Sequence, residues 1–119
     1  MSKKTYELNW YGSFFITIQL DHEKDIEQIF KEMNEYWGGC EDRLRKYNDN
    51  ITYVGLKLIA ERAFYLIVQD LTSVEELRSK IKDEEGFWDI DEKQGIKIID
   101  YYWSGLDDFG ITITEVGND

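Results

Sequence analysis

Cysteine, histidine and long apolar runs are all scarce in this chain of 119 residues. The single cysteine, Cys40, excludes an internal disulfide and a zinc site built from several cysteines. The single histidine, His22, removes most metalloenzymes and the catalysts that pair histidine with a nucleophile. Apolar runs are only a few residues long, whereas a membrane-spanning helix needs roughly 18 or more. No apolar signal core follows Met1–Lys4, so we expect a cytoplasmic protein.

Proline is missing altogether, although average usage of about 5% would give roughly six in a chain of this length. Its absence fits short turns and no stiff linker. The chain has the length of one ordinary domain, and its content of aromatic residues, 15%, argues against disorder. We therefore expect a single domain over residues 1–119.

Basic residues are scarce in the last third of the chain. The whole chain has 25 acidic and 14 basic residues, a net charge of −11. Residues 1–82 carry a net charge of −2, whereas residues 83–119 carry 11 acids and two lysines, a net charge of −9. Such a field repels nucleic acid and anionic lipid and attracts basic surfaces. A solvated acidic surface would give the same composition, and the uneven distribution leaves a binding role open.

Two kinds of periodicity predict the secondary structure. Alternation of apolar and polar side chains predicts strands over residues 5–12, 13–20, 96–103 (with one slip of phase) and 110–116. Helical spacing or a capping box predicts helices over residues 26–37 and 73–82. Residues 40–50 are polar, without a predicted element. Residues 51–69 suit either a long buried helix or strands, and their length favours the helix.

This order of elements predicts an α+β fold. We expect a mostly antiparallel sheet of about four strands, made of an N-terminal hairpin plus a C-terminal strand pair. Two or three helices should cover one face of the sheet.

The motifs that would indicate catalysis or a metal site are weak. Asp89, Asp91 and Asp100 have the spacing of calcium-loop positions 1, 3 and 12, but Gln94 replaces the glycine that such a loop needs. Cys40 is followed by acids rather than by the cations that activate a nucleophilic cysteine. We therefore predict no catalytic residue, metal or cofactor, and we expect a binding protein rather than an enzyme.

The most unusual segment places two large aromatic residues, Phe87 and Trp88, inside a run of acids. These rings could plug the edge of the sheet while the acids face water. Alternatively, an aromatic anchor surrounded by carboxylates could bind a basic partner. Aromatic and acidic residues occur together again near residues 101–108. The predicted partner-binding residues are Glu84, Glu85, Phe87, Trp88, Asp89, Asp91, Tyr102, Asp107 and Asp108.

Several aromatic, acidic and glycine positions resemble those of one protein family. They are Asn34–Trp37, Asp42–Leu44, Glu85–Trp88, Asp91, Gly95–Ile98 and Asp107-Asp108. In these positions, and over most of its length, the chain resembles the small proteins catalogued as domain of unknown function 2528. The resemblance supplies no catalytic residues. It implies an occurrence in bacteria, phages and other mobile elements, and hence an accessory or anti-defence role.

The leading functional hypothesis is a non-enzymatic inhibitor of a basic host protein that handles nucleic acid, such as a CRISPR effector or another defence nuclease. A groove built for DNA is strongly cationic, so the acids of residues 83–108 could occlude it, with Trp88 and Tyr102 as anchors. No direct binding to nucleic acid or membrane is expected. An immunity or antitoxin-like protein, a small hydrolase or metal-dependent enzyme, and a module that oligomerises through aromatic residues are the alternatives.

Overall fold

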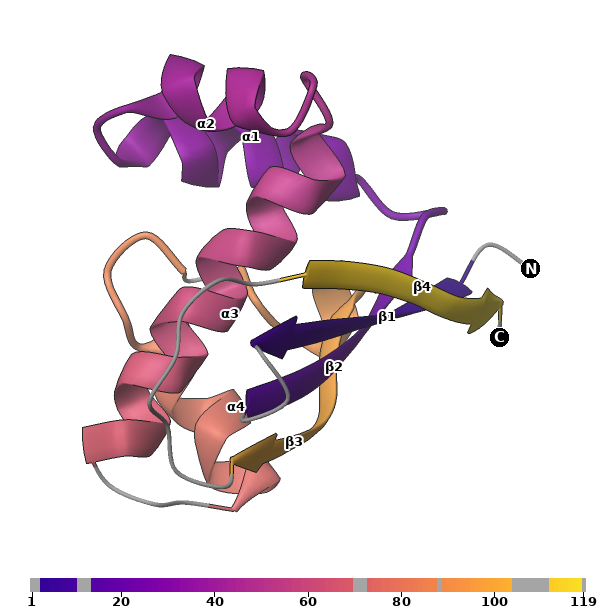
Figure 1. The fold of residues 1–119 in the computed structure, drawn as a ribbon. Coiled ribbons are helices and arrows are strands. Elements are labelled where there is room, and N and C mark those ends of the chain that lie inside the picture. Colours follow the sequence, from indigo (N-terminus) through magenta and orange to yellow (C-terminus); the bar gives the residue numbers. More distant parts are fainter. Residues whose placement is uncertain (1–2, 11–13, 70–72, 88, 104–111, 119) are drawn as a thin grey trace.

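The computed structural model describes residues 3–10, 14–69, 73–87, 89–103 and 112–118. Within these ranges lie four strands, four α-helices and one short 3-10 helix (Figure 1). The strands are β1 (Lys3–Trp10), β2 (Phe14–Asp21), β3 (Ile96–Trp103) and β4 (Thr112–Asn118). The helices are α1 (Ile26–Tyr36), α2 (Cys40–Lys46), α3 (Ile51–Gln69), α4 (Val74–Lys82) and the 3-10 helix η1 (Glu92–Gln94).

The four described strands form one antiparallel sheet in the order β3-β2-β1-β4. This confirms the predicted α+β class and the N-terminal hairpin. The two C-terminal strands are not neighbours, because β1 and β2 lie between them. Every second side chain of β2, from Phe14 to Leu20, is almost completely buried, whereas in the edge strand β3 full burial ends at Ile98. None of the helices in the described ranges has the length and hydropathy of a bilayer span.

The phase slip predicted in the third strand is an irregularity in the pairing of β2 with β3. The register shifts between Thr17 and Ile18, so Ile98 and Tyr101 both face the helices despite their odd spacing. Arg78 of α4 lies beside this irregularity. Its Nε donates to the carbonyl oxygen of Ile98 at 2.6 Å, and its Nη2 reaches that of Ile99 at 3.5 Å. The guanidinium group thus satisfies backbone acceptors of an edge strand.

Residues 51–69 form the helix that their length favoured. α3 is buried on most sides, which is why its apolar residues show no single stripe. Gly55 lets α1 approach α3 closely. A Cβ at this position would lie only 2.2 Å from Cγ of Phe30, whose ring is fully buried. This contact fixes where α1 lies over the rest of the fold.

The segment after α1, for which the sequence indicated no element, begins with the short helix α2. None of the residues of α2 is fully buried, and only Leu44 packs against the core, so the helix lacks the apolar stripe that reveals most helices. Its acids are in the first turn and its bases in the last, which complements the helix dipole. Arg43 ties α2 to the end of α1, donating to the carbonyl oxygens of Asn34, Trp37 and Gly38 at 2.7–3.0 Å. Arg43 therefore has a structural role.

Candidate functional site

The acidic and aromatic segment that the sequence singled out forms a turn between α4 and η1. Gly86 has a φ of +86° and lies against the end of α1. A Cβ on Gly86 would be 2.9 Å from Cδ2 of Tyr36 and 3.1 Å from the ring of Trp37. Glycine is therefore required both by the left-handed backbone and by the close approach. The turn and the C-terminal half of α1 thus form one surface.

Phe87 fixes this turn to the core. The ring is 3% exposed and lies 6.1 Å from the ring of Trp37, measured between centroids. Ile90 is likewise 3% exposed. The plug interpretation describes Phe87 better than the anchor interpretation, although the aromatic residue inserts beneath α1 rather than at an edge of the sheet. Such burial leaves Phe87 available only as part of a pocket wall.

The four described acids of the turn have different surroundings. Glu84 accepts a hydrogen bond from Nε of Arg62 at 2.6 Å and forms an ion pair with the same guanidinium group. Asp91 accepts from the backbone N–H of Gln94 at 3.0 Å and pairs with Nζ of Lys82 at 3.3 Å. These two acids hold the turn in place. Glu85 and Asp89 are exposed.

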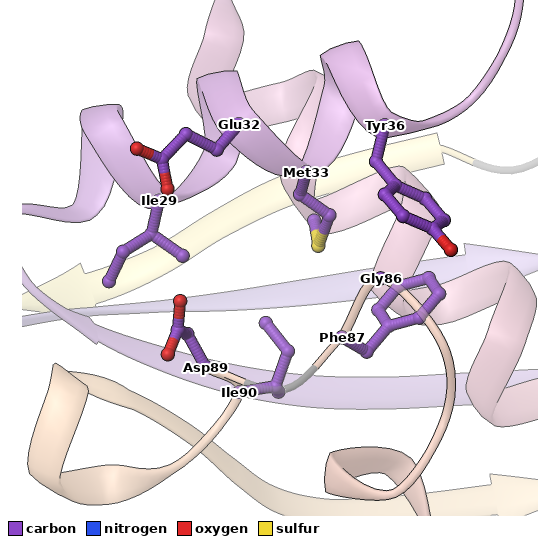
Figure 2. Close-up of a pocket in the computed structure, with 8 residues that line it drawn as sticks. All are labelled: Ile29, Glu32, Met33, Tyr36, Gly86, Phe87, Asp89 and Ile90. Carbon is purple, nitrogen blue, oxygen red and sulfur yellow. The ribbon is translucent and has the colours of Figure 1, made fainter.

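A pocket of about 160 Å³ lies between α1 and the turn (Figure 2). Its lining residues are Ile29, Glu32, Met33, Tyr36, Gly86, Phe87, Asp89 and Ile90. We call it the acidic pocket, because its apolar interior is bordered by the carboxylates of Glu32 and Asp89 and none of its described lining residues is basic. Both carboxylates lie toward the Ile29 end, whereas Tyr36 and Phe87 close the other end (Figure 2).

The two carboxylates lack a cationic partner among the residues that the structure describes. Glu32 accepts one hydrogen bond, from Nε2 of Gln28 to its Oε2 at 2.9 Å. Asp89 makes no side-chain hydrogen bond or ion pair with the described part of the chain. Two negative charges are therefore held beside apolar surface without internal neutralisation.

Tyr36 links the acidic pocket to a third carboxylate. Its hydroxyl group donates a hydrogen bond to Oε1 of Glu85. This hydrogen bond, together with some desolvation and the negative charge of Glu85, raises the pKa of Tyr36 above its ordinary value of 10.0. Tyr36 is 43% exposed, and its ring packs edge-on against Trp37 at 5.0 Å between centroids. An exposed aromatic ring thus extends the apolar surface of the pocket outward.

The structure separates Tyr102 from this surface. Trp103 faces the helices, with its ring 5.9 Å from that of Phe64 in α3. Tyr102, the preceding residue of the strand, therefore faces away from the helices. It is 58% exposed and lies beside Phe15 on the open face of the sheet. Trp88, Asp107 and Asp108 lie outside the described residues.

The sequence analysis missed the α1 residues of the pocket. Ile29 and Met33 belong to the apolar spacing that predicts the helix over residues 26–37, and Glu32 and Tyr36 lie beside them with the same spacing of four residues. The helical period was thus a usable signal for a shared face. That this face meets the Gly86–Ile90 turn depends on a contact between segments some 50 residues apart, which periodicity does not encode.

Two of the chemistries weighed from the sequence depend on histidine, cysteine or clustered carboxylates. The lining residues of the acidic pocket include neither a histidine nor a cysteine. In the described ranges, no group of three or more histidine, cysteine, aspartate or glutamate side chains is placed to hold a metal ion. Of the calcium-like spacing, Asp91 is occupied as an N-cap and ion-pair partner, and Asp100 accepts from the backbone N–H of Tyr101 at 2.8 Å. The exposed carboxylates and apolar walls of the acidic pocket are complementary to a cationic, partly apolar group.

Comparison with known proteins defines the class of this chain. The model of a family described as "Protein of unknown function (DUF2528)" matches residues 15–118. The chain belongs to this family, as its aromatic, acidic and glycine positions suggested.

Two similar relatives come from a phage and a prophage. One is "Protein ea10" of Escherichia phage lambda, and the other is "Lambda prophage-derived protein ea10" of Escherichia coli O6:H1 (strain CFT073). Each is 27% identical over 112 residues, which are 91% of this chain and 90% of the relative. No solved structure matches the chain.

Proposed function

We propose that this protein is a non-enzymatic, acidic binding protein of a phage or mobile element that inhibits a basic, nucleic-acid-handling host defence protein. A CRISPR effector or another defence nuclease is the kind of target that fits, and inhibition consists of occluding its nucleic-acid groove. The observation that carries the proposal is the acidic pocket. There Glu32 and Asp89 border apolar surface and have no cationic partner among the residues that the structure describes.

Two further observations support this proposal. The net charge of −11 speeds encounter with a cationic groove and makes binding weaken as salt is added. The two relatives named as a phage protein and a prophage-derived protein support an origin in a phage or mobile element. A protein that fills a DNA groove must offer negative charge outward, and two of the four described acids in the turn do so.

The geometry changes which residues a test should alter. Neutralising Glu84 or Asp91 would disturb the Arg62 and Lys82 contacts that hold the turn, so loss of binding would be ambiguous. The informative variant is Glu32→Gln/Glu85→Gln/Asp89→Asn. Its matched control is Glu23→Gln/Glu41→Gln/Asp49→Asn, which removes the same charge from exposed positions outside the pocket.

The experiment is a tagged pull-down from the lysate of a bacterial host that carries defence systems, at low and at moderate salt. Wild type and the matched control should retain a stoichiometric basic nucleic-acid-binding protein at low salt. The pocket variant should not retain it, and added duplex DNA should displace it from wild type. The proposal is wrong if no such protein is captured at either salt, or if the pocket variant captures it as well as wild type does.

A further inference from the structure

We propose that the acidic pocket receives one lysine side chain of the partner, with the alkyl stem inside and the ammonium group between Glu32 and Asp89. This inference rests on the proposed function for the identity of the partner, but the chemistry of the pocket carries it. The volume of the pocket, about 160 Å³, is close to the volume that holds a single small ring or side chain. The partner therefore inserts one residue here rather than a helix or a loop.

The walls of the pocket match a long, unbranched stem. Ile29, Met33 and Ile90 supply aliphatic and thioether surface, and Phe87 supplies the edge of a ring. Lysine buries its methylene groups along apolar surface while its charged end stays near water. A short polar side chain would leave this apolar interior unfilled. An acidic side chain would also face two carboxylates of its own charge.

The mouth of the pocket favours an ammonium over a guanidinium group. Arginine pairs best in a plane with both oxygens of one carboxylate. Glu32 and Asp89 come from different elements, α1 and the turn, and Oε2 of Glu32 already accepts from Gln28 at 2.9 Å, so a planar pair with both oxygens of Glu32 would compete with that hydrogen bond. An ammonium group donates three diverging hydrogen bonds. In the proposed complex it donates to the carboxylates of Glu32 and Asp89, which lie toward the same end of the pocket (Figure 2).

The test uses the full chain and three synthetic probes, because no partner needs to be known. The probes are hexalysine, hexaarginine and a hexapeptide of 2,4-diaminobutyrate, whose amine has a stem shorter by two methylene groups. Binding is followed by the methyl NMR signals of Ile29, Met33 and Ile90, with those of Val68 and Val116 as remote references. Titrations at about pH 6 keep all the amines protonated.

The expected result is a saturable shift of the three pocket methyl signals with hexalysine, and smaller shifts at the remote valines. The diaminobutyrate peptide should bind up to about 15-fold more weakly, since its stem lacks two methylene groups and each buried methylene contributes about 0.8 kcal/mol. Glu32→Gln/Asp89→Asn should weaken hexalysine binding about tenfold or more, whereas Glu23→Gln/Asp49→Asn should leave it within about twofold. Urea unfolding of each variant confirms that it is folded.

Three outcomes would overturn the lysine assignment. They are equal or tighter binding of hexaarginine at the pocket signals, equal binding of the shorter-stemmed peptide, and hexalysine shifts that bypass Ile29, Met33 and Ile90. The two proposals fail separately. Capture of a basic host protein without a hexalysine response at the pocket removes only this inference, whereas a hexalysine response without any host partner removes only the proposed function.

Discussion

Two pockets flank residues 83–94. They differ in whether the charged side chains that line them have partners within the protein. The acidic pocket, of about 160 Å³, borders α1. Its two carboxylates, Glu32 and Asp89, have no cationic partner among the residues that the structure describes. The second pocket, of about 190 Å³, lies between α4 and β3 and has Ile90 as a shared wall. We call it the charge-matched pocket. Its lining residues are Arg78, Ser79, Lys82, Ile90, Asp91, Glu92, Ile96, Lys97 and Ile98.

Each charged group of the charge-matched pocket has an internal partner. Lys82 contacts Asp91 at 3.3 Å, and Lys97 contacts Glu92 at 3.8 Å. The guanidinium group of Arg78 contacts backbone carbonyl oxygens of β3. Removing one of these groups should therefore affect the stability of the fold, and least at the exposed Lys97–Glu92 pair. A carboxylate in the acidic pocket has no such partner, so its effect should appear only in binding. The predictions below test this contrast.

The largest loss of stability is expected at the contact between Gly55 and Phe30, which positions α1. Gly55→Ala would place a Cβ within 2.2–2.5 Å of three atoms of the Phe30 ring, which is buried and cannot move outward. Overpacking of this kind costs about 1–3 kcal/mol, which exceeds the gain of up to about 1 kcal/mol from replacing glycine within a helix. Urea unfolding should show the loss. Hexalysine binding should fall as well, because Ile29 and Met33 move with α1.

Gly38→Ala is the matched control for this substitution. A Cβ at Gly38 has no atom within 4 Å, so the free energy of unfolding should change by less than about 0.5 kcal/mol. If Gly55→Ala also leaves stability and hexalysine binding unchanged, the contact between Gly55 and Phe30 does not position the acidic pocket.

The next effect concerns the charge-matched pocket. Arg78→Ala removes the donor to the carbonyl oxygens of Ile98 and Ile99 and should lower the free energy of unfolding by about 1–3 kcal/mol. Lys93→Ala removes the same charge from an exposed residue of η1 and should change stability by less than about 0.5 kcal/mol. Equal unfolding midpoints for the two variants would show that Arg78 is not needed at the edge of the sheet.

A smaller change in stability should distinguish Glu84 from Asp89, which the sequence placed in one predicted binding segment. Glu84→Gln weakens a half-buried contact with Arg62 and should cost about 1 kcal/mol of stability. Asp89→Asn should leave stability within about 0.5 kcal/mol while weakening hexalysine binding severalfold. Chemical unfolding and methyl NMR titration measure the two quantities on the same samples. The contrast between the pockets is wrong if Asp89→Asn destabilises the protein as much as Glu84→Gln does.

Local patterns in the sequence accounted for most of the fold. Alternation predicted the hairpin and the slip of phase in β3, and Ser73 and Glu76 form both hydrogen bonds of the predicted capping box. α2 was not predicted because none of its residues is fully buried and Leu44 alone packs against the core, and the separation of β3 from β4 was not predicted because strand order depends on long-range packing. Periodicity reports which side of an element is apolar, but not which distant segment covers it.

The candidate site was predicted only in part for the same reason. Composition and the run of acids indicated the segment of residues 84–91, and the structure makes this segment one wall of a pocket. Nothing local distinguished Glu84, held by Arg62, from Asp89, which has no partner in the described ranges. The cations that neutralise Glu84 and Asp91 come from α3 and α4, so only the tertiary structure separates the structural acids from the available ones.

The smallest change in stability is expected at Tyr36, whose hydroxyl group donates a hydrogen bond to Glu85 beside the acidic pocket. The hydrogen bond to Glu85 raises the pKa of Tyr36, so its contribution to stability is complete below about pH 10 and is lost as pH rises through the raised pKa. Burial also raises the pKa of Tyr6 and Tyr47. These two tyrosines titrate in wild type and Tyr36→Phe alike, so the difference between the two proteins isolates Tyr36.

Urea unfolding from about pH 8 to pH 11, together with tyrosinate absorbance, should therefore show a wild-type advantage that shrinks as pH rises. An advantage that grows with pH would contradict the assigned hydrogen bond. Near neutral pH, Tyr36→Phe leaves Glu85 without this internal donor and adds an unpaired carboxylate beside the acidic pocket. Hexalysine should then bind slightly more tightly, by about twofold or less. The same substitution thus lowers stability and raises affinity, as expected if charges matched within the fold stabilise it and unmatched charges serve binding.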